Sequence, residues 1–386
     1  MEKFLPYGHQ TIEQDDIEAI TKVITADYLA QGPEVEKFEN AIKEYTGAKY
    51  CIAVSSGTAA LHLAVKVLNL PKGSEGITSP ISFVASSNCL IYNDIKPNFA
   101  DIELENYCID PYKIKKRITE NTKVLIPVDF AGYAGFMPRI KELADQYGLY
   151  IIEDAAHAFG SKYDNGEMVG CCKYSDMTIF SFHPVKTITT GEGGAITTNN
   201  KQFYEQLLLL RSHGIERLED NMSINPGPWY YEMKELGFNY RMTDIQAALG
   251  NSQIKKIDKF RHLRNCICEK YFYNIKTSNY IKKQNIIKSS NSCMHIYVLR
   301  ILFDKIGKDR KQVIKELSEL GIGTQVHYIP IYKQPYYKLN YHFKQTDFPN
   351  TEEYYSQALT IPLYPSMNEE DIERVIDGIN KVIPNE

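Results

Sequence analysis

The chain has 386 residues, of which 43% are hydrophobic and 24% charged, and its formal net charge is −4. These values are typical of a soluble globular protein and exclude a disordered, collagen-like or coiled-coil chain. Lys and Arg are scattered among Asp and Glu, so we expect no surface for nucleic acid or membrane. The length exceeds what one hydrophobic core usually fills, which predicts a large domain and a smaller one.

The cysteines and the N-terminus indicate the cellular compartment. Eight cysteines are spread along the chain without the spacing of a zinc site, so we expect reduced thiols and no metal. Residues 1–7 lack the basic and apolar regions of a signal peptide, and no apolar stretch approaches the ~18 residues of a membrane span. The sequence therefore predicts a cytoplasmic protein.

Short apolar runs alternate with longer amphipathic segments from about residue 49 onward. The predicted strand and helix pairs are residues 50–54 and 58–69, 77–79 and 82–92, and 124–128 and 138–147, followed by strands at 150–152, 177–182 and 195–198. This strand–helix–strand order predicts an α/β fold with a largely parallel sheet that is covered by helices on both faces.

The order of elements changes after a long, mostly polar helix that begins near Ile245. The later part has a predicted strand at 295–303, a helix at 310–320 and a closing helix at 368–382. Residues 276–292 are rich in Lys, Asn and Ser, so we expect a loop there. We place a large domain with an N-terminal arm at residues 1–252 and a small C-terminal α+β domain at residues 253–386.

Two strand ends carry polar motifs, and ligands of open α/β sheets bind beyond such ends. The turn at 55–61 (SSGTAAL) opens a helix, which suits a phosphate, although an N-cap made by Ser56 or Thr58 also accounts for it. Glu153, Asp154 and His157 follow the strand at 150–152. A carboxylate buried there needs a cationic partner, unless it is a structural acid or a helix cap.

A third strand end carries a lysine. Lys186 follows the strand at 177–182 and precedes the glycine-rich turn at 191–194. The turn has neither the residue order of a Walker loop nor the spacing of a dinucleotide fingerprint. We therefore interpret Lys186 as an amine nucleophile, and a phosphate cradle, an Asp and a Lys are together the groups needed to hold pyridoxal phosphate (PLP).

These motifs in this order resemble the nucleotide-sugar aminotransferases of fold type I, the DegT/StrS type of PLP enzyme, and the resemblance covers essentially the whole chain. The matching stretches are SGTAAL (56–61), SPISFVA (79–85), EDAAH (153–157), SFHPVK (181–186), GEGGA (191–195), RSHG (211–214) and GFNYRM (237–242). The resemblance implies that Lys186 binds PLP covalently and shuttles a proton, and that Asp154 keeps the pyridine nitrogen protonated.

The same resemblance implies the other contacts to PLP. The implied ligands are Gly57, Thr58 and Ser181 for the phosphate; Phe83, stacked on the ring; His157, near the phenol oxygen; and Asn239, donated to the phosphate by the neighbouring subunit of a homodimer with shared active sites. For Phe83 and His157 a packing role is the alternative, and Arg241 in the last motif could pair with an acid at the interface.

Features outside these motifs indicate the substrate. Residues 79–84, 128–132, 228–233 with the only tryptophan, and 325–332 look most like the C4 aminotransferases of the pseudaminic acid route. This resemblance implies transfer of nitrogen from glutamate to a UDP-linked 4-keto-6-deoxy-N-acetyl-hexosamine, with Tyr7 and His327 near the sugar nucleotide. The product would be UDP-4-amino-4,6-dideoxy-N-acetyl-β-L-altrosamine.

Three other readings remain open at the level of the sequence. One is C4 amination of another nucleotide sugar, of the UDP-bacillosamine, legionaminic or GDP-perosamine type. Another is a deoxysugar dehydrase, in which a histidine replaces the lysine found here at Lys186. The third is a regulatory protein of PLP fold without turnover, which would tolerate loss of Lys186 or Asp154. The sugar, the stereochemistry at the aminated carbon, the amino donor and the assembly beyond a dimer are left open.

Overall fold

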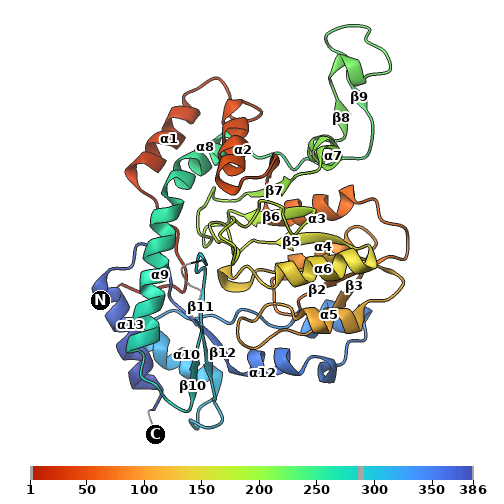
Figure 1. Ribbon diagram of the computed structural model, residues 1–386. Coiled ribbons are helices and arrows are strands. Elements are labelled where there is room, and N and C mark those ends of the chain that lie inside the picture. Colours follow the sequence, from red (N-terminus) through yellow and green to blue (C-terminus); the bar gives the residue numbers. More distant parts are fainter. Residues whose placement is uncertain (1–2, 286–290, 385–386) are drawn as a thin grey trace.

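The computed structural model describes residues 3–285 and 291–384 (Figure 1). Within these residues, the large sheet has seven strands in the order β1-β7-β6-β5-β4-β2-β3. They are β1 (Tyr50–Val54), β2 (Glu75–Thr78), β3 (Lys96–Phe99), β4 (Thr122–Ile126), β5 (Tyr150–Asp154), β6 (Met177–Ser181) and β7 (Gly194–Thr198). The sheet is mixed and mostly parallel, as the sequence predicts.

The direction of β7 determines which residues meet at the edge of the sheet. Strands β2 to β6 pair in parallel, whereas β7 pairs antiparallel with both β1 and β6. Gly194, the first residue of β7, therefore lies opposite Val54 at the end of β1 and opposite Ser181 at the end of β6. The carboxyl ends of β1 and β6 are thus held close together by the register of a third strand.

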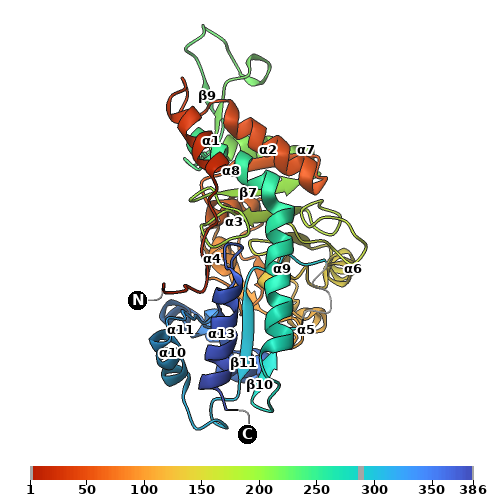
Figure 2. The same cartoon turned by 90° about the vertical axis from the view of Figure 1, so that its left-hand side faces the viewer.

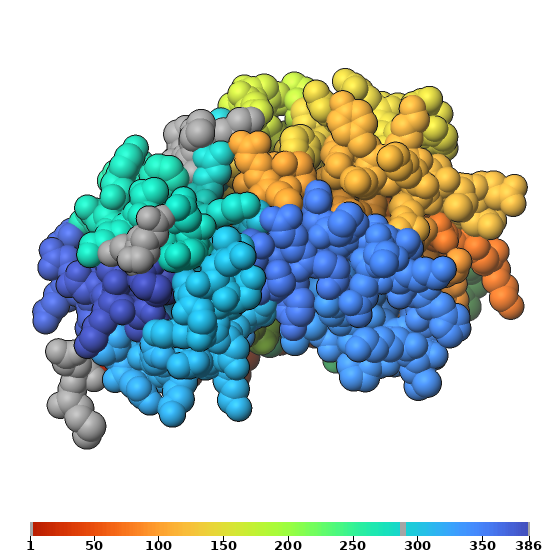
Figure 3. All heavy atoms as spheres, turned by 90° about the horizontal axis from the view of Figure 1, so that it is seen from below, coloured from red at the N-terminus to blue at the C-terminus, as the bar shows by residue number. Residues whose placement is uncertain are grey.

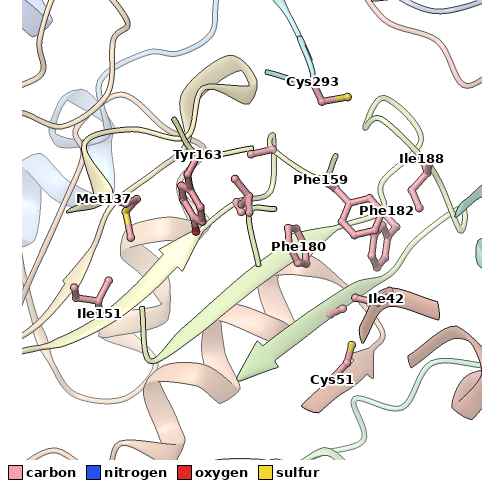
Figure 4. Close-up of a cluster of buried hydrophobic side chains, with 14 of the residues drawn as sticks. Ile42, Cys51, Met137, Ile151, Phe159, Tyr163, Phe180, Phe182, Ile188 and Cys293 are labelled. Atoms are coloured by element: carbon pink, nitrogen blue, oxygen red, sulfur yellow. The ribbon is translucent and has the colours of Figure 1, made fainter. Parts of the chain in front are cut away.

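Helices cover both faces of this sheet, because alternate strand residues point to opposite sides. Ile151 and Phe180 belong to one buried cluster, and Ile152 and Ile179 belong to another. Part of the first cluster is shown in Figure 4, where Phe159 packs edge-on against Phe180. The helices of this region are α1 (Gln14–Ile24), α2 (Pro33–Thr46), α3 (Gly57–Val67), α4 (Ala85–Ile91), α5 (Pro111–Arg117), α6 (Met137–Tyr147), α7 (Lys201–Arg211) and α8 (Asp244–Gln253).

A smaller sheet follows in the chain. In the described part of the chain its order is β10-β11-β12, all antiparallel. The strands are β10 (Ile281–Lys283), β11 (Tyr297–Ile301) and β12 (Ala358–Ile361), and the helices packed with them are α9 (Ile257–Asn274), α10 (Arg310–Glu319) and α13 (Glu369–Val382). Figure 2 shows α9 running from the large sheet region down beside α13.

The two sheet regions are joined by more than α9. Leu5 of the N-terminal arm is buried in the core of the small sheet and bridges to Ile322. Helices α11 (Pro335–Asn340) and α12 (Pro349–Gln357) return to the large sheet, where Tyr337 and Phe348 surround Phe99 of β3. Figure 3 shows this blue segment packed beside the orange part of the chain. The domain boundary near residue 252, at the end of α8, stays our proposal.

The loop prediction for residues 276–292 is wrong in part, because it contains the edge strand β10. Lysines are common on edge strands, where they discourage pairing with other chains. Here Lys283 also donates to the carbonyls of Phe272 and Ile275, at 2.6 and 2.5 Å, where α9 ends. Residues 286–290 of the predicted loop lie outside the described residues.

A hairpin of β8 (Ile215–Glu216) and β9 (Glu232–Met233) projects from the molecule beyond α7 (Figure 1). Several of its large apolar side chains are exposed, Trp229 by 71% and Leu218 by 67%, and Leu236 just after it by 74%. All eight cysteines are free. No helix in residues 3–285 or 291–384 is both long and apolar enough to cross a membrane.

Candidate active site

The carboxyl ends of β1, β5 and β6 border a cavity of about 620 Å³, a size typical of small-molecule sites. Its lining brings together residues from widely separated stretches of the chain, from Tyr7 in the N-terminal arm to the segment at 325–329. Of the residues predicted from the sequence, it includes Tyr7, Gly57, Thr58, Phe83, Asp154, His157, Ser181, Lys186 and His327. Asn239 does not line it; that residue is exposed and bridges to Ser212 at the base of the projecting hairpin.

One end of the cavity is the N-terminus of α3. The hydroxyl of Ser56 accepts a hydrogen bond from the N–H of Ala59 at 3.1 Å, so Ser56 is the N-cap. Within the described structure the N–H groups of Gly57 and Thr58 have no acceptor, and they face the cavity together with the positive end of the helix dipole. The N-cap at Ser56 is confirmed, and it leaves two donors free, so the anion site stays a prediction.

Gly57 allows the close approach of α3 to β6. A Cβ at this position would lie 2.8 Å from the Cβ of Ser181, closer than real Cβ atoms come. The hydroxyl of Ser181 would be 3.1 Å from the same point. The small residue thus brings a side-chain hydroxyl beside the two free N–H groups, and the three donors form a cradle for a phosphate.

Lys186 lies five residues beyond Ser181, the last residue of β6, and the exposed part of its side chain faces the cavity. Loss of water around the ammonium lowers the pKa of Lys186 to about 8, although the nearby charge of Asp154 acts in the opposite direction. The amine is therefore partly unprotonated near neutral pH, as a nucleophile or a proton carrier must be.

Asp154 is the last residue of β5 and is buried at the cavity wall. Its carboxylate accepts a hydrogen bond from the Ser86 hydroxyl at 2.5 Å and from the Ala156 N–H at 3.2 Å. Burial raises the pKa of Asp154, while these two donors and the charge of Lys186 oppose the rise. The charge of Lys186 thus favours the ionised form of this carboxylate.

The neighbouring carboxylate, Glu153, lies outside the cavity, although the sequence places both acids at the same strand end. Alternation along β5 points Glu153 to the opposite face. There it is fully buried and accepts hydrogen bonds from the hydroxyls of Tyr163, Thr178 and Ser175. Glu153 is therefore a satisfied structural acid, and only Asp154 is available to a ligand.

The rear wall of the cavity holds three imidazoles, those of His157, His295 and His327. Burial lowers the pKa of each, and the charge of Lys186 adds to the effect; the pKa of His327 falls to about 3. All three are therefore neutral at physiological pH. Among the described residues no group of His, Cys, Asp and Glu could hold a metal ion.

Sequence reasoning missed three of the residues that shape this wall. Ser86 holds Asp154, His295 packs on His157 with ring centroids 4.4 Å apart, and Tyr328 lies with its hydroxyl 3.0 Å from Nε2 of His157. Ser86 lies three residues after Phe83 and Tyr328 directly follows His327, so their nearness to predicted site residues was an available signal. For His295 the one signal is its position at the start of a predicted strand.

The rim of the cavity is made by the N-terminal arm and the segment at 325–329. The rings of Tyr7 and His327 have centroids 5.1 Å apart, and Nδ1 of His327 lies 2.9 Å from the Thr360 hydroxyl. Phe83 is 59% exposed, with its ring centroid 6.5 Å from that of Tyr328. An exposed aromatic ring at a cavity mouth offers a flat apolar surface to a planar ligand.

The donor set fits pyridoxal phosphate. The cradle at α3 suits the phosphate, the buried carboxylate of Asp154 suits a protonated ring nitrogen, and the amine of Lys186 suits the aldehyde. The imidazoles that line the cavity with Asp154 are neutral and cannot pair with its charge. A protonated ring nitrogen would give this buried carboxylate a cationic partner. The cavity thus has one partner for each polar group of this cofactor.

Comparisons with known proteins agree with this geometry. The model of the DegT/DnrJ/EryC1/StrS aminotransferase family matches residues 10–380. The chain is 36% identical over 382 residues to the UDP-4-amino-4,6-dideoxy-N-acetyl-β-L-altrosamine transaminase of Campylobacter jejuni, which covers 98% of this chain and 97% of that one. It is also 36% identical over 381 residues to the spore coat polysaccharide biosynthesis protein SpsC of Bacillus subtilis, with the same coverage.

A solved structure of an aminotransferase is also similar to this chain over nearly its whole length. Helicobacter pylori PseC, an aminotransferase involved in the biosynthesis of pseudoaminic acid, superposes with a TM-score of 0.90 at 30% identity over 99% of both chains. Its similarity confirms the fold type I architecture. The chain belongs to the DegT/DnrJ/EryC1/StrS aminotransferase family, whose enzymes depend on pyridoxal phosphate.

Proposed function

We propose that the chain is a cytoplasmic enzyme that transfers an amino group from L-glutamate to C4 of a UDP-linked 4-keto-6-deoxy-N-acetyl-hexosamine. The product is UDP-4-amino-4,6-dideoxy-N-acetyl-β-L-altrosamine, in pseudaminic acid biosynthesis. The observation that carries the proposal is the convergence of Lys186, Asp154 and the α3 cradle on one cavity. Full-length similarity to the Campylobacter jejuni transaminase and to PseC supports the choice of sugar.

Pyridoxal phosphate supplies the electron sink that makes a C–H bond beside its nitrogen acidic and carries the amino group between substrates. Lys186 anchors the cofactor and, when released, moves a proton on its side of the cavity. Asp154 holds the proton on the ring nitrogen, because a carboxylate this buried requires a cationic partner. Gly57, Thr58 and Ser181 bind the phosphate and so fix the cofactor at the opposite end.

One cavity serves both substrates in turn, because the amino donor leaves as a keto acid before the keto sugar enters. His157, His295 and His327 are neutral and add no positive charge to the cavity, whose lining also includes the acids Asp154 and Glu192. Tyr7 and His327, on the rim, are the residues proposed to contact the sugar nucleotide.

We further propose a homodimer with shared active sites. Asn239 lies outside the cavity of its own chain and is exposed, which leaves its amide free to bind the phosphate in the cavity of the partner. The hairpin beside it exposes Trp229 and Leu218 to solvent. Large exposed apolar side chains on a projecting segment mark an interaction site. In the dimer this hairpin reaches the rim of the partner's cavity.

The identity of the sugar is tested by a paired comparison of two UDP-4-keto epimers that differ in configuration at C5. The L-arabino epimer belongs to the pseudaminic route and the D-configured epimer to the bacillosamine and legionaminic routes. We expect a higher kcat/KM for the L-arabino epimer, with the 4-amino product identified by mass and NMR. A clear preference for the D-configured epimer, or for a GDP- or dTDP-linked sugar, would refute the choice of sugar and leave the aminotransferase in place.

A further inference from the structure

Gln253, the last residue of α8, joins three separate segments of the chain through its side-chain amide. The amide nitrogen donates to the carbonyl of Thr11 at 3.0 Å and to the carboxylate of Asp16 at 2.8 Å. The amide oxygen accepts from the N–H of Thr189 at 3.4 Å. These partners fix the orientation of the amide, because a carbonyl can only accept and a backbone N–H can only donate. Gln253 is buried, so the three bonds are shielded from water.

One of these segments is the loop that carries Lys186, residues 182–193 between β6 and β7, here called the Lys186 loop. Gln253 holds one point of it, and the side-chain nitrogen of Gln246 donates to the carbonyl of Glu192 at 2.7 Å. The two glutamines are seven residues apart, which is about two helical turns, so they lie on one face of α8. The Lys186 loop is thus attached at two points to a single helix.

The N-terminal arm is attached to the same amide and also touches the Lys186 loop directly. A Cβ at Gly8 would lie 3.4 Å from the Cβ of Val185, which is ordinary van der Waals contact. The neighbours of these two residues, Tyr7 in the arm and Lys186 in the loop, both line the cavity. The place of Tyr7 on the rim, relative to the wall that carries Lys186, therefore depends on how the arm is held.

The third segment, α1, supplies a charge that the amide meets. Asp16 is buried, and its Oδ1 lies 2.8 Å from Nζ of Lys256, whereas its Oδ2 accepts from Gln253. Nζ of Lys256 also lies 2.6 Å from Asp15. A buried carboxylate is stable only with such partners, because burial disfavours its charge. At Gln253 the chain therefore needs a neutral donor, and a second negative charge there would push α1 and the arm away.

We infer that Gln253 is a positioning residue that holds the N-terminal arm against the Lys186 loop and so places Tyr7 for binding of the nucleotide sugar. The inference rests on the proposed function, in which Tyr7 contacts that substrate. Gln253 does not line the cavity, so it acts only through the segments that its amide joins. The phosphate cradle and Asp154 belong to other elements. Loss of the amide should therefore weaken binding of the nucleotide sugar more than binding of the cofactor.

The main test is Gln253→Glu, which keeps the size of the side chain and changes its bonding at one end. The new carboxylate can still accept from the N–H of Thr189, but it cannot donate to Thr11 and it repels Asp16. The arm is thus released while the Lys186 loop keeps its bond. We expect the KM for the UDP-4-keto sugar, at saturating glutamate, to rise by about tenfold, which corresponds to the loss of one hydrogen bond. The effect on kcat should be smaller, and the visible spectrum of the bound cofactor should stay as in wild type.

The matched control is Gln284→Glu, which makes the same change at another buried glutamine. Gln284 accepts from the N–H of Val298 at 2.8 Å in the small sheet region, so this variant should leave the KM for the sugar unchanged. Gln253→Asn covers the case in which the added charge prevents folding. It is neutral and one carbon shorter, so it cannot span all three partners and should raise the same KM. A wild-type KM in either folded Gln253 variant would overturn the inference, as would failure of both to fold, which would make Gln253 a purely structural residue.

Hydrogen exchange in the full-length chain without added cofactor is independent of the proposed function. In Gln253→Glu we expect exchange to become about tenfold faster in residues 5–12 of the arm and to stay unchanged in the Lys186 loop, whereas Gln284→Glu should alter neither. An arm that exchanges as in wild type would contradict the inference. If the arm exchanges faster as expected and the wild-type enzyme aminates no UDP-linked keto sugar, it is the proposed function that fails.

Discussion

The two ends of the cavity are built in different ways. The cofactor end consists of strand ends and a helix N-terminus, where Val54, Ser181 and Gly194 are fixed beside one another by sheet register. The other end, which we propose binds the sugar and call the sugar end, consists of the N-terminal arm and the segment at 325–329. The chemistry is thus placed on the rigid scaffold and the recognition on loops, which is how one fold serves many substrates.

Asp154, at the cofactor end, is more buried and has more hydrogen bonds than Ile329 and Tyr7 on the rim. Asp154 is 3% exposed and has two donors within 3.2 Å. On the rim, Ile329 is 46% exposed, and Tyr7 is anchored through its backbone carbonyl, which accepts from the N–H of Leu363 at 3.0 Å. Substitutions at the cofactor end should therefore abolish turnover, and substitutions at the sugar end should change substrate affinity.

The largest expected effect is that of Lys186→Ala. Without the amine, no group on this wall can anchor the cofactor or move the proton, so turnover should fall by at least about a thousandfold, at the upper part of the range for general acid–base catalysis. Pyridoxal phosphate should still bind loosely through Asp154 and the cradle. The exposed Lys201→Ala is the control. Wild-type turnover in Lys186→Ala would remove this residue from the site.

Asp154→Asn is expected to have the next largest effect. The amide cannot keep the ring nitrogen protonated, so kcat should fall by roughly a hundredfold or more, which corresponds to about 3 kcal/mol. Glu153→Gln is the matched comparison on the adjacent residue. It loses a charge that three hydroxyls stabilise and should lower the melting temperature while the folded enzyme keeps its cofactor spectrum. Equal effects of both variants on the spectrum would contradict the assignment.

The positions of the strand-end residues at the cofactor end could be predicted from the sequence, whereas several other elements and cavity residues could not. The ends of β1, β5 and β6 follow from apolar runs, and Gly57, Asp154 and Lys186 lie within a few residues of those ends. Strand β3 and the hairpin strands escape such reasoning because they are only four and two residues long. Tyr328 and His295 reach the cavity only through tertiary packing of the later segments.

The pH dependence of Lys186 provides a third prediction. In the chain without cofactor, the amine with a pKa of about 8 is neutral above pH 8 and charged below it. At pH 7 its neutral fraction exceeds that of an ordinary lysine, pKa ~10.4, by roughly a hundredfold. An amine-directed reagent should therefore label Lys186 with a midpoint near pH 8. A midpoint near 10 would contradict the desolvated amine.

The lowered pKa of Lys186 also makes the free energy of unfolding depend on pH. The unfolded chain holds the proton of this lysine up to about pH 10.4, whereas the folded chain releases it near pH 8. Between these values the unfolded state binds more protons, so the contribution of Lys186 to the free energy of unfolding rises with pH. That contribution is lost as the pH falls through 8. Lys186→Met should remove it, as measured by urea unfolding at a series of pH values.

Trp229→Ala tests the proposal that the projecting hairpin reaches the partner's cavity and contacts the nucleotide sugar there. Loss of one aromatic face should raise the KM for the nucleotide sugar by about tenfold, the size of a single stacking contact, with kcat and the cofactor spectrum unchanged. Tyr273→Ala, an exposed ring on α9, is the control. An unchanged KM in a stable dimer would assign Trp229 to packing between subunits only.

The smallest effect is expected from mixing two inactive variants, Lys186→Ala and Asn239→Ala. If Asn239 serves the partner's cavity, each mixed dimer has one intact site, and a random mixture should recover about a quarter of wild-type activity. Each variant mixed with itself provides the baseline. No recovery in mixed dimers of verified composition would place Asn239 outside the shared site.

The central claim is that Lys186 is the residue that carries the cofactor at the junction of the three strand ends. Reduction of the yellow holoenzyme with borohydride, followed by digestion and mass spectrometry, identifies that lysine directly. We predict the pyridoxyl label on the peptide that contains Lys186, and no such label after incubation with glutamate has converted the cofactor to its amine form. A label on any other lysine would contradict the account.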